Sequence, residues 1–269
     1  MSAEKNTEPS QALRCKNGIC IEDSLELIGE EPFLIRIDSK PYSVVMRTPG
    51  DEMSHAAGFC HGEGIVDSPD DFIAMGFCED VDPNVIDIRL KPKRREKIKD
   101  ILDRRGFISQ TSCGICGKEM IKDLHQILTP VKDDFTLTID NVWNCIAGLS
   151  KNQNYYKRTR GSHASLIFDN QLEEIAFAED VGRHNALDKA IGNAFMNKKL
   201  STARIVIMSS RISYELIQKS ARANFQIMIS HSRPTAMAVK MGKALNMTLA
   251  CPGKDGELLI FSGEKRIIK

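Results

Sequence analysis

The chain has 269 residues, of which 42% are hydrophobic, and its formal net charge is +1. This length is enough for one large domain or two ordinary ones, and the near-zero charge gives no reason to expect a nucleic acid or a membrane as a partner. No apolar run reaches the roughly 18 residues of a membrane span, and residues 1–11 lack the apolar core of a signal peptide. We therefore expect a cytoplasmic protein, and in that reducing compartment no disulfide framework among its cysteines.

The first part of the chain is predicted as a disordered tail followed by a small α+β unit. Residues 1–18 are polar and aperiodic, as is typical of disorder. The unit, with its linker, spans residues 19–110. Its predicted elements are a hairpin of residues 33–37 and 42–47, a helix ending near residue 62, a strand pair of residues 72–77 and 84–90, and a charged connecting helix over residues 91–105. On the first helix, His55 and His61 are expected at the surface and Cys60 in the core, where Cys145 is expected too.

The second part of the chain alternates short strands and helices. The predicted order is a helix at 140–153, strands at 163–168 and 172–177, a helix at 185–196, a strand at 204–208, a helix at 214–223, a strand at 226–230, a helix at 235–245, and strands at 247–250 and 258–261. Such alternation predicts βα crossovers and a partly parallel sheet covered on both faces. The fold class is therefore α/β, with an α+β unit at the N-terminus.

Between the two parts lies a C-x-x-C pair, Cys113 and Cys116, flanked by glycines. A helix predicted over residues 118–128 follows, and its N-terminus together with Lys118 favours a thiolate. Glycine makes the loop mobile. The spacing is typical of redox or sulfur chemistry, and also of metal binding.

Two zinc alternatives follow from the same pair. His61-Gly62-Glu63 precedes it in the order of the H-x-E…P-C-x-x-C signature of zinc deaminases, although Ser112 replaces the proline. A structural zinc module needs four ligands, and the chain offers a single C-x-x-C.

Three turns in the second part carry similar chemistry. Each follows a predicted strand, and each places an arginine with polar neighbours where a helix begins, a pattern that favours a phosphate group. The candidate binding residues are Asp180, Arg183, His184, Ser210, Arg211, His231 and Arg233. Asp180 is expected either to accept from a purine or ribose or to cap the next helix, and His184 either to contact the ligand or to hydrogen-bond within the protein.

Several stretches resemble the formate dehydrogenase accessory sulfurtransferases, the FdhD family. They are residues 47–52 and 62–65, the Cys-Gly-Ile-Cys-Gly loop at 113–117, Phe-Ala-Glu-Asp-Val-Gly-Arg-His-Asn-Ala-Leu-Asp-Lys at 177–189, and residues 210–215 and 233–239. The resemblance covers residues 33–262. It implies a cytidine-deaminase-like α/β/α fold with a mixed sheet for residues 111–269, preceded by the mobile cysteine loop.

The resemblance also implies an activity. A cysteine desulfurase loads sulfur as a persulfide on Cys113, with Cys116 in support, and the sulfur passes to the molybdenum bis(molybdopterin guanine dinucleotide) cofactor of formate dehydrogenase. A guanine nucleotide would mimic that cargo. The family's cofactor contacts near the C-terminus correspond by position to Pro252, Gly253, Lys254, Asp255, Gly256 and Glu257. Here the chain departs from the family pattern, because Cys251-Pro252-Gly253-Lys254 stands where the family has an aromatic residue followed by Arg-Gly. Fold analogy adds a homodimer.

Overall fold

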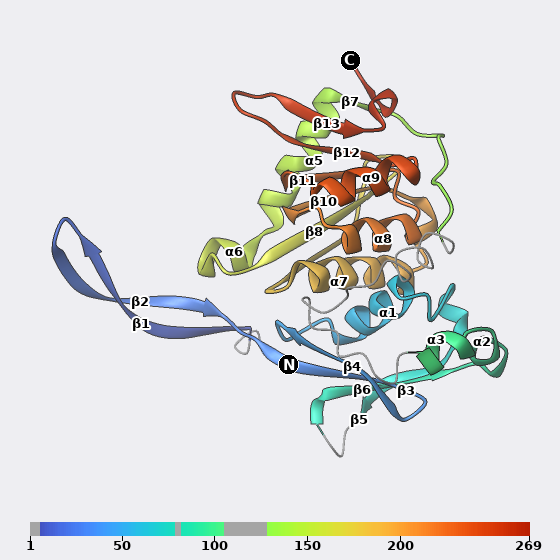
Figure 1. The fold of residues 1–269 in the computed structure, drawn as a ribbon. Coiled ribbons are helices and arrows are strands. Elements are labelled where there is room, and N and C mark those ends of the chain that lie inside the picture. The colour runs from blue at the N-terminus through green and yellow to red at the C-terminus, as the bar shows by residue number, and fades with distance from the viewer. Residues whose placement is uncertain (1–5, 79–81, 105–127) are drawn as a thin grey trace.

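The computed structural model of the chain describes residues 6–78, 82–104 and 128–269, which form two layered units and a projecting ribbon (Figure 1). The larger unit is built on a six-stranded sheet with the order β13-β12-β11-β10-β8-β9. Its strands are β8 (His163–Asp169), β9 (Glu174–Asp180), β10 (Ala203–Arg211), β11 (Ile227–Ser232), β12 (Thr248–Pro252) and β13 (Leu258–Ser262). Strands β10, β11 and β12 run parallel and the other pairs antiparallel, which confirms the predicted mixed sheet.

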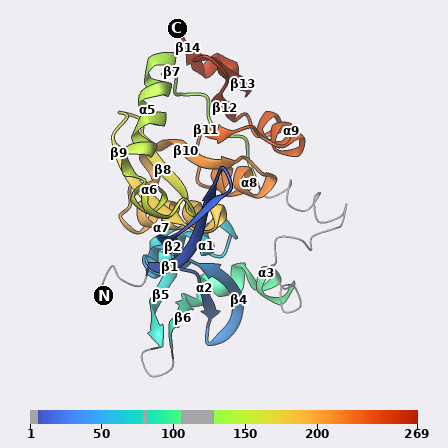
Figure 2. The ribbon, with the colours of Figure 1, turned by 90° about the vertical axis from the view of Figure 1, so that its left-hand side faces the viewer.

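Helices cover both faces of this sheet (Figure 2). One face packs on α5 (Ile139–Asn152), and the other on α7 (Arg183–Met196), α8 (Tyr214–Arg222) and α9 (Ala236–Ala244). Because side chains alternate along a strand, Ile205 and Ile207 of β10 join the α5 side, while Val206 and Met208 join the other. A strand that is buried on both faces has a continuous run of apolar residues in its sequence. Smaller elements are α6 (Asn154–Thr159) and the pair β7 (Leu137–Thr138) and β14 (Ile267–Ile268).

The smaller unit is a four-stranded sheet with the order β4-β3-β6-β5. It comprises β3 (Glu31–Ile37), β4 (Lys40–Arg47), α1 (Glu52–Gly62), β5 (Phe72–Cys78), β6 (Asp82–Leu90), α2 (Pro92–Lys97) and α3 (Lys99–Arg104). The predicted hairpin, helix and strand pair are therefore confirmed. The predicted connecting helix is instead two short helices, separated at Ile98, whose side chain is buried in the core of this unit.

The two units meet where α1 crosses α7, and two glycines allow the close approach. A Cβ atom on Gly58 would lie 1.8 Å from the carbonyl oxygen of Asp188, and one on Gly192 would lie 1.7 Å from that of Ser54. Such contacts are impossible, so only glycine fits at either position. Phe195, near the end of α7, packs into the core of the smaller unit. The units therefore share a tight interface.

The structure corrects two expectations at the N-terminus. Thr7–Lys16 form β1, which pairs antiparallel with β2 (Ile19–Ile28), so the predicted disordered tail is wrong over these residues. Asn17 and Gly18 connect the strands with positive φ angles of 52° and 79°, as a two-residue hairpin turn requires. Cys15 and Cys20 face each other across the ribbon and form a disulfide, contrary to the expectation of none. The ribbon projects from the body beside α6 (Figure 1).

Within the described ranges, no helix is both long and apolar enough to cross a membrane.

Candidate functional site

The three predicted turns meet at one edge of the six-stranded sheet. Strands β9 and β10 each run antiparallel to β8, and β11 and β12 run parallel to β10. The carboxyl ends of β9, β10, β11 and β12 therefore share an edge, which is where ligands bind in open α/β sheets. Helices α7, α8 and α9 begin there, and the loop between β12 and β13 joins them.

At the first turn, α7 begins at Arg183, two residues earlier than predicted, so Arg183 and His184 belong to its first turn. The Nε2 atom of His184 lies 2.8 Å from a carboxylate oxygen of Glu215 on α8, and 3.4 Å from the hydroxyl of Ser213. The hydrogen bond from His184 lowers the pKa of Glu215. His184 therefore has a partner within the protein, and Glu215 is a neighbour that the sequence analysis missed.

The second turn leaves a helix end open. Arg211 is exposed at the end of β10, beside Ser232 of β11, while Ser210 is buried and its carbonyl accepts from Ser230. In the described chain, neither Gly182 before α7 nor Ser213 before α8 makes a side-chain cap.

By contrast, Thr235 caps α9 through a 3.2 Å bond from the backbone N–H of Ala238. The first N–H groups of an uncapped helix remain available to an anion. The beginnings of α7 and α8 are thus the better phosphate sites at this edge.

At the third turn, His231 near the end of β11 and Arg233 directly after β11 are both exposed. Burial raises the pKa of Cys251 at the end of β12, and the charge of Arg233 opposes that rise. Arg233 therefore lies close to the strand that leads into the predicted C-terminal contact segment.

That segment, residues 252–257, forms a tight turn between β12 and β13. The N–H of Gly253 donates to the carbonyl of Glu257 at 2.7 Å, and the N–H of Glu257 to that of Lys254 at 2.9 Å. Asp255 and Gly256 have positive φ angles. Pro252 and Gly253 are half-buried and the remaining four residues are exposed. The turn therefore presents Lys254 at the same edge as the arginines.

Asp180 is predicted either to accept from a ligand or to cap the next helix, and in the structure its side chain binds within the protein. Its side chain is fully buried, and its oxygens accept from Lys189 at 2.8 Å, the N–H of Thr48 at 3.0 Å, the N–H of Gly182 at 2.8 Å and the amide of Asn185 at 2.9 Å. Thr48 belongs to the smaller unit. Asp180 therefore ties the two units together behind the edge.

His163, at the start of β8, belongs to the edge but was not predicted as a site residue. Its Nδ1 atom lies 3.3 Å from the hydroxyl of Ser209. Burial lowers the pKa of His163, and the charges of Arg183 and His184 lower it further. His163, Arg183 and His184 are thus neighbours at this end of the edge.

The cysteine pair, Cys113 and Cys116, and most of the helix predicted at 118–128 lie outside the described residues. The flanks are described: α3 ends at Arg104, and Leu128 packs against the core of the larger unit. Among the described residues, no three His, Cys, Asp or Glu side chains are grouped to hold a metal ion.

The predicted surface positions of His55 and His61 are wrong. The side chains are 0% and 6% exposed, because α1 lies between its own sheet and α7. His61 packs on Phe195 with ring centroids 5.0 Å apart, and burial lowers its pKa to about 4. Cys60 and Cys145 are buried, as predicted.

These features define the class of this protein: an α/β protein with arginines at one edge of its main sheet, whose sequence carries a cysteine pair before that sheet. The profile of the FdhD/NarQ family matches residues 28–268, and the chain belongs to this family. The family assigned from the motifs is thereby confirmed.

Relatives match over nearly the whole chain. Sulfur carrier protein FdhD of Streptomyces avermitilis is 32% identical over 97% of this chain and 95% of its own length. The proteins of the same name from Mycobacterium tuberculosis and Sulfurisphaera tokodaii are 32% and 30% identical, over 90% and 92% of this chain and 91% and 93% of theirs. A crystal structure from Desulfotalea psychrophila, assigned as a formate dehydrogenase accessory protein, covers 97% of this chain and 99% of its own with a TM-score of 0.77. At 19% identity, that match shows a shared fold.

Proposed function

We propose that this chain is a sulfur carrier that supports the maturation of formate dehydrogenase, acting as a sulfurtransferase in the cytoplasm. Curated relatives covering nearly its whole length bear the name of sulfur carrier. The observation that carries the proposal is the convergence of Arg183, Arg211 and Arg233 on one sheet edge, in a chain that also supplies a C-x-x-C pair. Sulfur delivery needs both a reactive thiol and a place to hold the acceptor.

The chemistry takes place on two cysteines. The thiolate of Cys113 attacks the outer sulfur of a persulfide on a cysteine desulfurase, so that the S–S bond of the donor breaks, the donor leaves as a thiolate and Cys113 becomes the persulfide. The thiolate of Cys116 then attacks the inner sulfur of that persulfide. A Cys113–Cys116 disulfide forms, and hydrosulfide leaves toward the acceptor metal. A dithiol reductant resets the pair by taking over the disulfide.

The acceptor in this proposal is molybdenum bis(molybdopterin guanine dinucleotide), bound as cargo. Its phosphates suit the three arginines and the open beginnings of α7 and α8, because an arginine fork and helix N–H groups both bind phosphate oxygens. Lys254 adds a point charge from the turn at residues 252–257. A guanine nucleotide is the corresponding soluble probe. We include in the proposal a cytidine-deaminase-like architecture for residues 111–269 and a homodimer, the latter by fold analogy.

The test is complementation of a strain that lacks its own copy of the carrier. The wild-type chain is expected to restore formate dehydrogenase activity, and Cys113→Ala to leave it at background. Cys145→Ala is the matched control, because Cys145 is buried at 3% exposure and serves packing alone. Full restoration by Cys113→Ala would contradict the proposal, whereas loss in both variants would point to a folding defect.

A further inference from the structure

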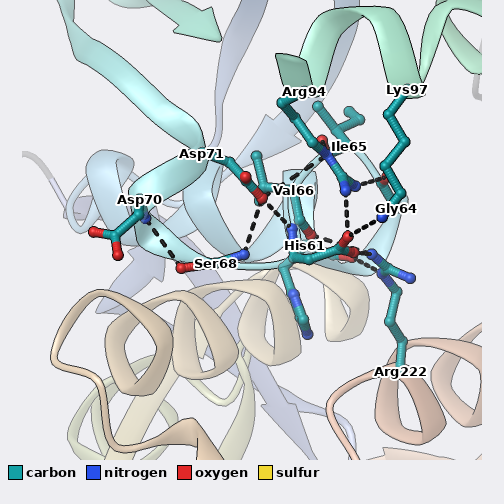
Figure 3. A network of polar contacts seen from close by, with 11 residues as sticks. His61, Gly64, Ile65, Val66, Ser68, Asp70, Asp71, Arg94, Lys97 and Arg222 are labelled. Atoms are coloured by element: carbon teal, nitrogen blue, oxygen red, sulfur yellow. Dashed lines mark hydrogen bonds and ion pairs between the residues drawn. The ribbon is translucent and has the colours of Figure 1, made fainter. Parts of the chain in front are cut away.

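The loop between α1 and β5 is held by two arginines that come from different units (Figure 3). From α2 in the smaller unit, Arg94 donates to the carbonyls of Ile65 and Gly64, each at 2.7 Å, and to the carboxylate of Asp67. From α8 in the larger unit, Arg222 donates to the other oxygen of Asp67 at 2.6 Å.

Arg222 also holds the backbone before Asp67. It donates to the carbonyl of Val66 at 3.2 Å and to that of His61. Asp67 is thus the one acidic side chain, among those described, that bridges a guanidinium of each unit in this loop.

The charge state of Asp67 suits a permanent bridge. Burial raises the pKa of Asp67, but the hydrogen bond and charge of Arg94, with further bonds from Lys97 and Arg222, outweigh burial and lower the pKa to about 2. The carboxylate therefore stays ionised throughout the neutral range. The Arg94 side chain is only 6% exposed whereas that of Asp67 is 48% exposed, so the ion pair is shielded from solvent on the arginine side alone. The two further hydrogen bonds from Arg94 to backbone carbonyls hold its guanidinium in place against Asp67.

The two bridged arginines lie on helices that lead to the two parts of the proposed site. α2 leads through α3 to Arg104, the last described residue before the chain reaches Cys113 nine positions later. α8 has nine residues, with Arg222 at its end and its beginning at the anion-binding edge, so the two ends are about 13 Å apart on one rigid helix. The bridge therefore fixes the start of the cysteine segment relative to that edge.

We propose that Asp67 is a positioning residue for sulfur delivery: by joining Arg94 to Arg222, it fixes the start of the cysteine segment relative to the bound acceptor. This inference rests on the proposed function. Nine residues reach at most about 30 Å, so the place where Arg104 is held limits the positions that Cys113 can reach. A displaced starting point would lower the rate at which Cys113 meets the acceptor, without changing the thiol or the acceptor site.

The experiment compares Asp67→Asn with Lys97→Met. Asparagine keeps the size of the side chain and removes its charge. Lys97 contacts Asp67 at 3.2 Å but is 70% exposed and lies on the same short helix as Arg94, so its loss leaves the link between the units intact.

Three quantities are measured on the full chain. They are sulfur loading of Cys113 by a cysteine desulfurase, the affinity for guanosine diphosphate, and the rate at which the loaded chain activates formate dehydrogenase in a single turnover. In Asp67→Asn, we expect sulfur loading and the affinity for guanosine diphosphate to stay within about twofold of wild type. The activation rate should fall about tenfold or more, because the loss of a charged hydrogen bond weakens the bridge by an amount of that order. Lys97→Met is expected to match wild type in all three.

A fourth measurement does not depend on the proposed function. Amide hydrogen exchange of residues 92–104 is expected to accelerate about tenfold or more in Asp67→Asn, while that of α5 stays unchanged, because local opening follows the lost contacts. Arg222→Gln, which breaks the bridge from α8, should give the same pattern and replaces Asp67→Asn if that variant does not fold.

If amide exchange of residues 92–104 is the same in Asp67→Asn as in wild type, Asp67 does not hold this segment. If that exchange is faster but the rate of formate dehydrogenase activation is unchanged, Asp67 has no positioning role. An equal fall in loading, affinity and activation also overturns it, since that pattern reports a general defect. Failure of the wild-type chain to take up sulfur is a different result: it refutes the proposed function, while exchange still decides whether Asp67 holds this segment.

Discussion

The crossing of α1 and α7 is predicted to tolerate no side chain at Gly192. In Gly192→Ala, the added Cβ would lie 1.7 Å from the carbonyl oxygen of Ser54 and 2.7 Å from the amide nitrogen of Gly58. Both are backbone atoms, which cannot rotate away, so the helices must separate. Overpacking of this kind costs about 3 kcal/mol at the upper end of its usual range, and the better helix propensity of alanine returns about 1 kcal/mol. We expect a net loss of about 2 kcal/mol in the free energy of unfolding.

Urea unfolding followed by circular dichroism measures this loss, and thermal unfolding should show a midpoint about 4–8 °C lower. The matched control is Gly76→Ala, because no atom lies within 4 Å of a Cβ built on Gly76. That variant should be as stable as wild type within about 0.5 kcal/mol, or slightly more stable. If Gly192→Ala unfolds at the wild-type urea concentration, the tight helix crossing described above is wrong.

Three further predictions concern charges. Burial lowers the pKa of His61 to about 4. Between that pH and the ordinary value near 6.5, only the unfolded chain binds the extra proton, so the free energy of unfolding decreases as the pH falls. Over this range, wild type should lose up to about 3 kcal/mol more of its free energy of unfolding than His61→Leu, as measured by urea unfolding at both pH values. His184→Ala should raise the pKa of Glu215 in an NMR titration, because it removes a ring nitrogen 2.8 Å from the carboxylate, and the hydrogen bond from that ring lowers the pKa of Glu215. Lys189→Met leaves the carboxylate of Asp180 buried without its cation and should destabilise the chain by about 3–5 kcal/mol.

Each of these has a contrary outcome. Equal acid sensitivity of His61→Leu and wild type would show that His61 already binds its proton in the folded chain. An unchanged pKa of Glu215 in His184→Ala would mean that the ion pair between the two residues does not persist in solution. For the buried lysine, the exposed Lys198→Met is the control, and equal stability of the two variants would contradict the role given to Lys189.

Much of the fold follows from local pattern. The apolar runs of β10 and β11, each followed by an amphipathic helix, predict parallel strands covered on both faces, and the structure has them. Because parallel strands end at one edge, the same pattern brings Arg211 and Arg233 together without any knowledge of side-chain contacts.

The errors have physical reasons as well. The ribbon was missed because β1 and β2 stabilise each other across a tight turn and bury little, so neither shows the pattern of a half-buried strand. His55 and His61 were misplaced because α1 is covered on two sides, which leaves it no consistent polar face. The contact between Asp180 and Thr48 could not be predicted, because the two residues are 132 positions apart and no local spacing reveals such a contact.

The central claim is that Cys113 carries the transferred sulfur, and mass spectrometry tests it most directly. The purified chain is incubated with a cysteine desulfurase and cysteine, then digested without reductant and mapped. A persulfide adds about 32 Da to the peptide that holds Cys113, and this added mass should disappear when an acceptor loaded with the cofactor is supplied. Added mass confined to any other cysteine, or mass on Cys113 that no acceptor removes, would contradict the account.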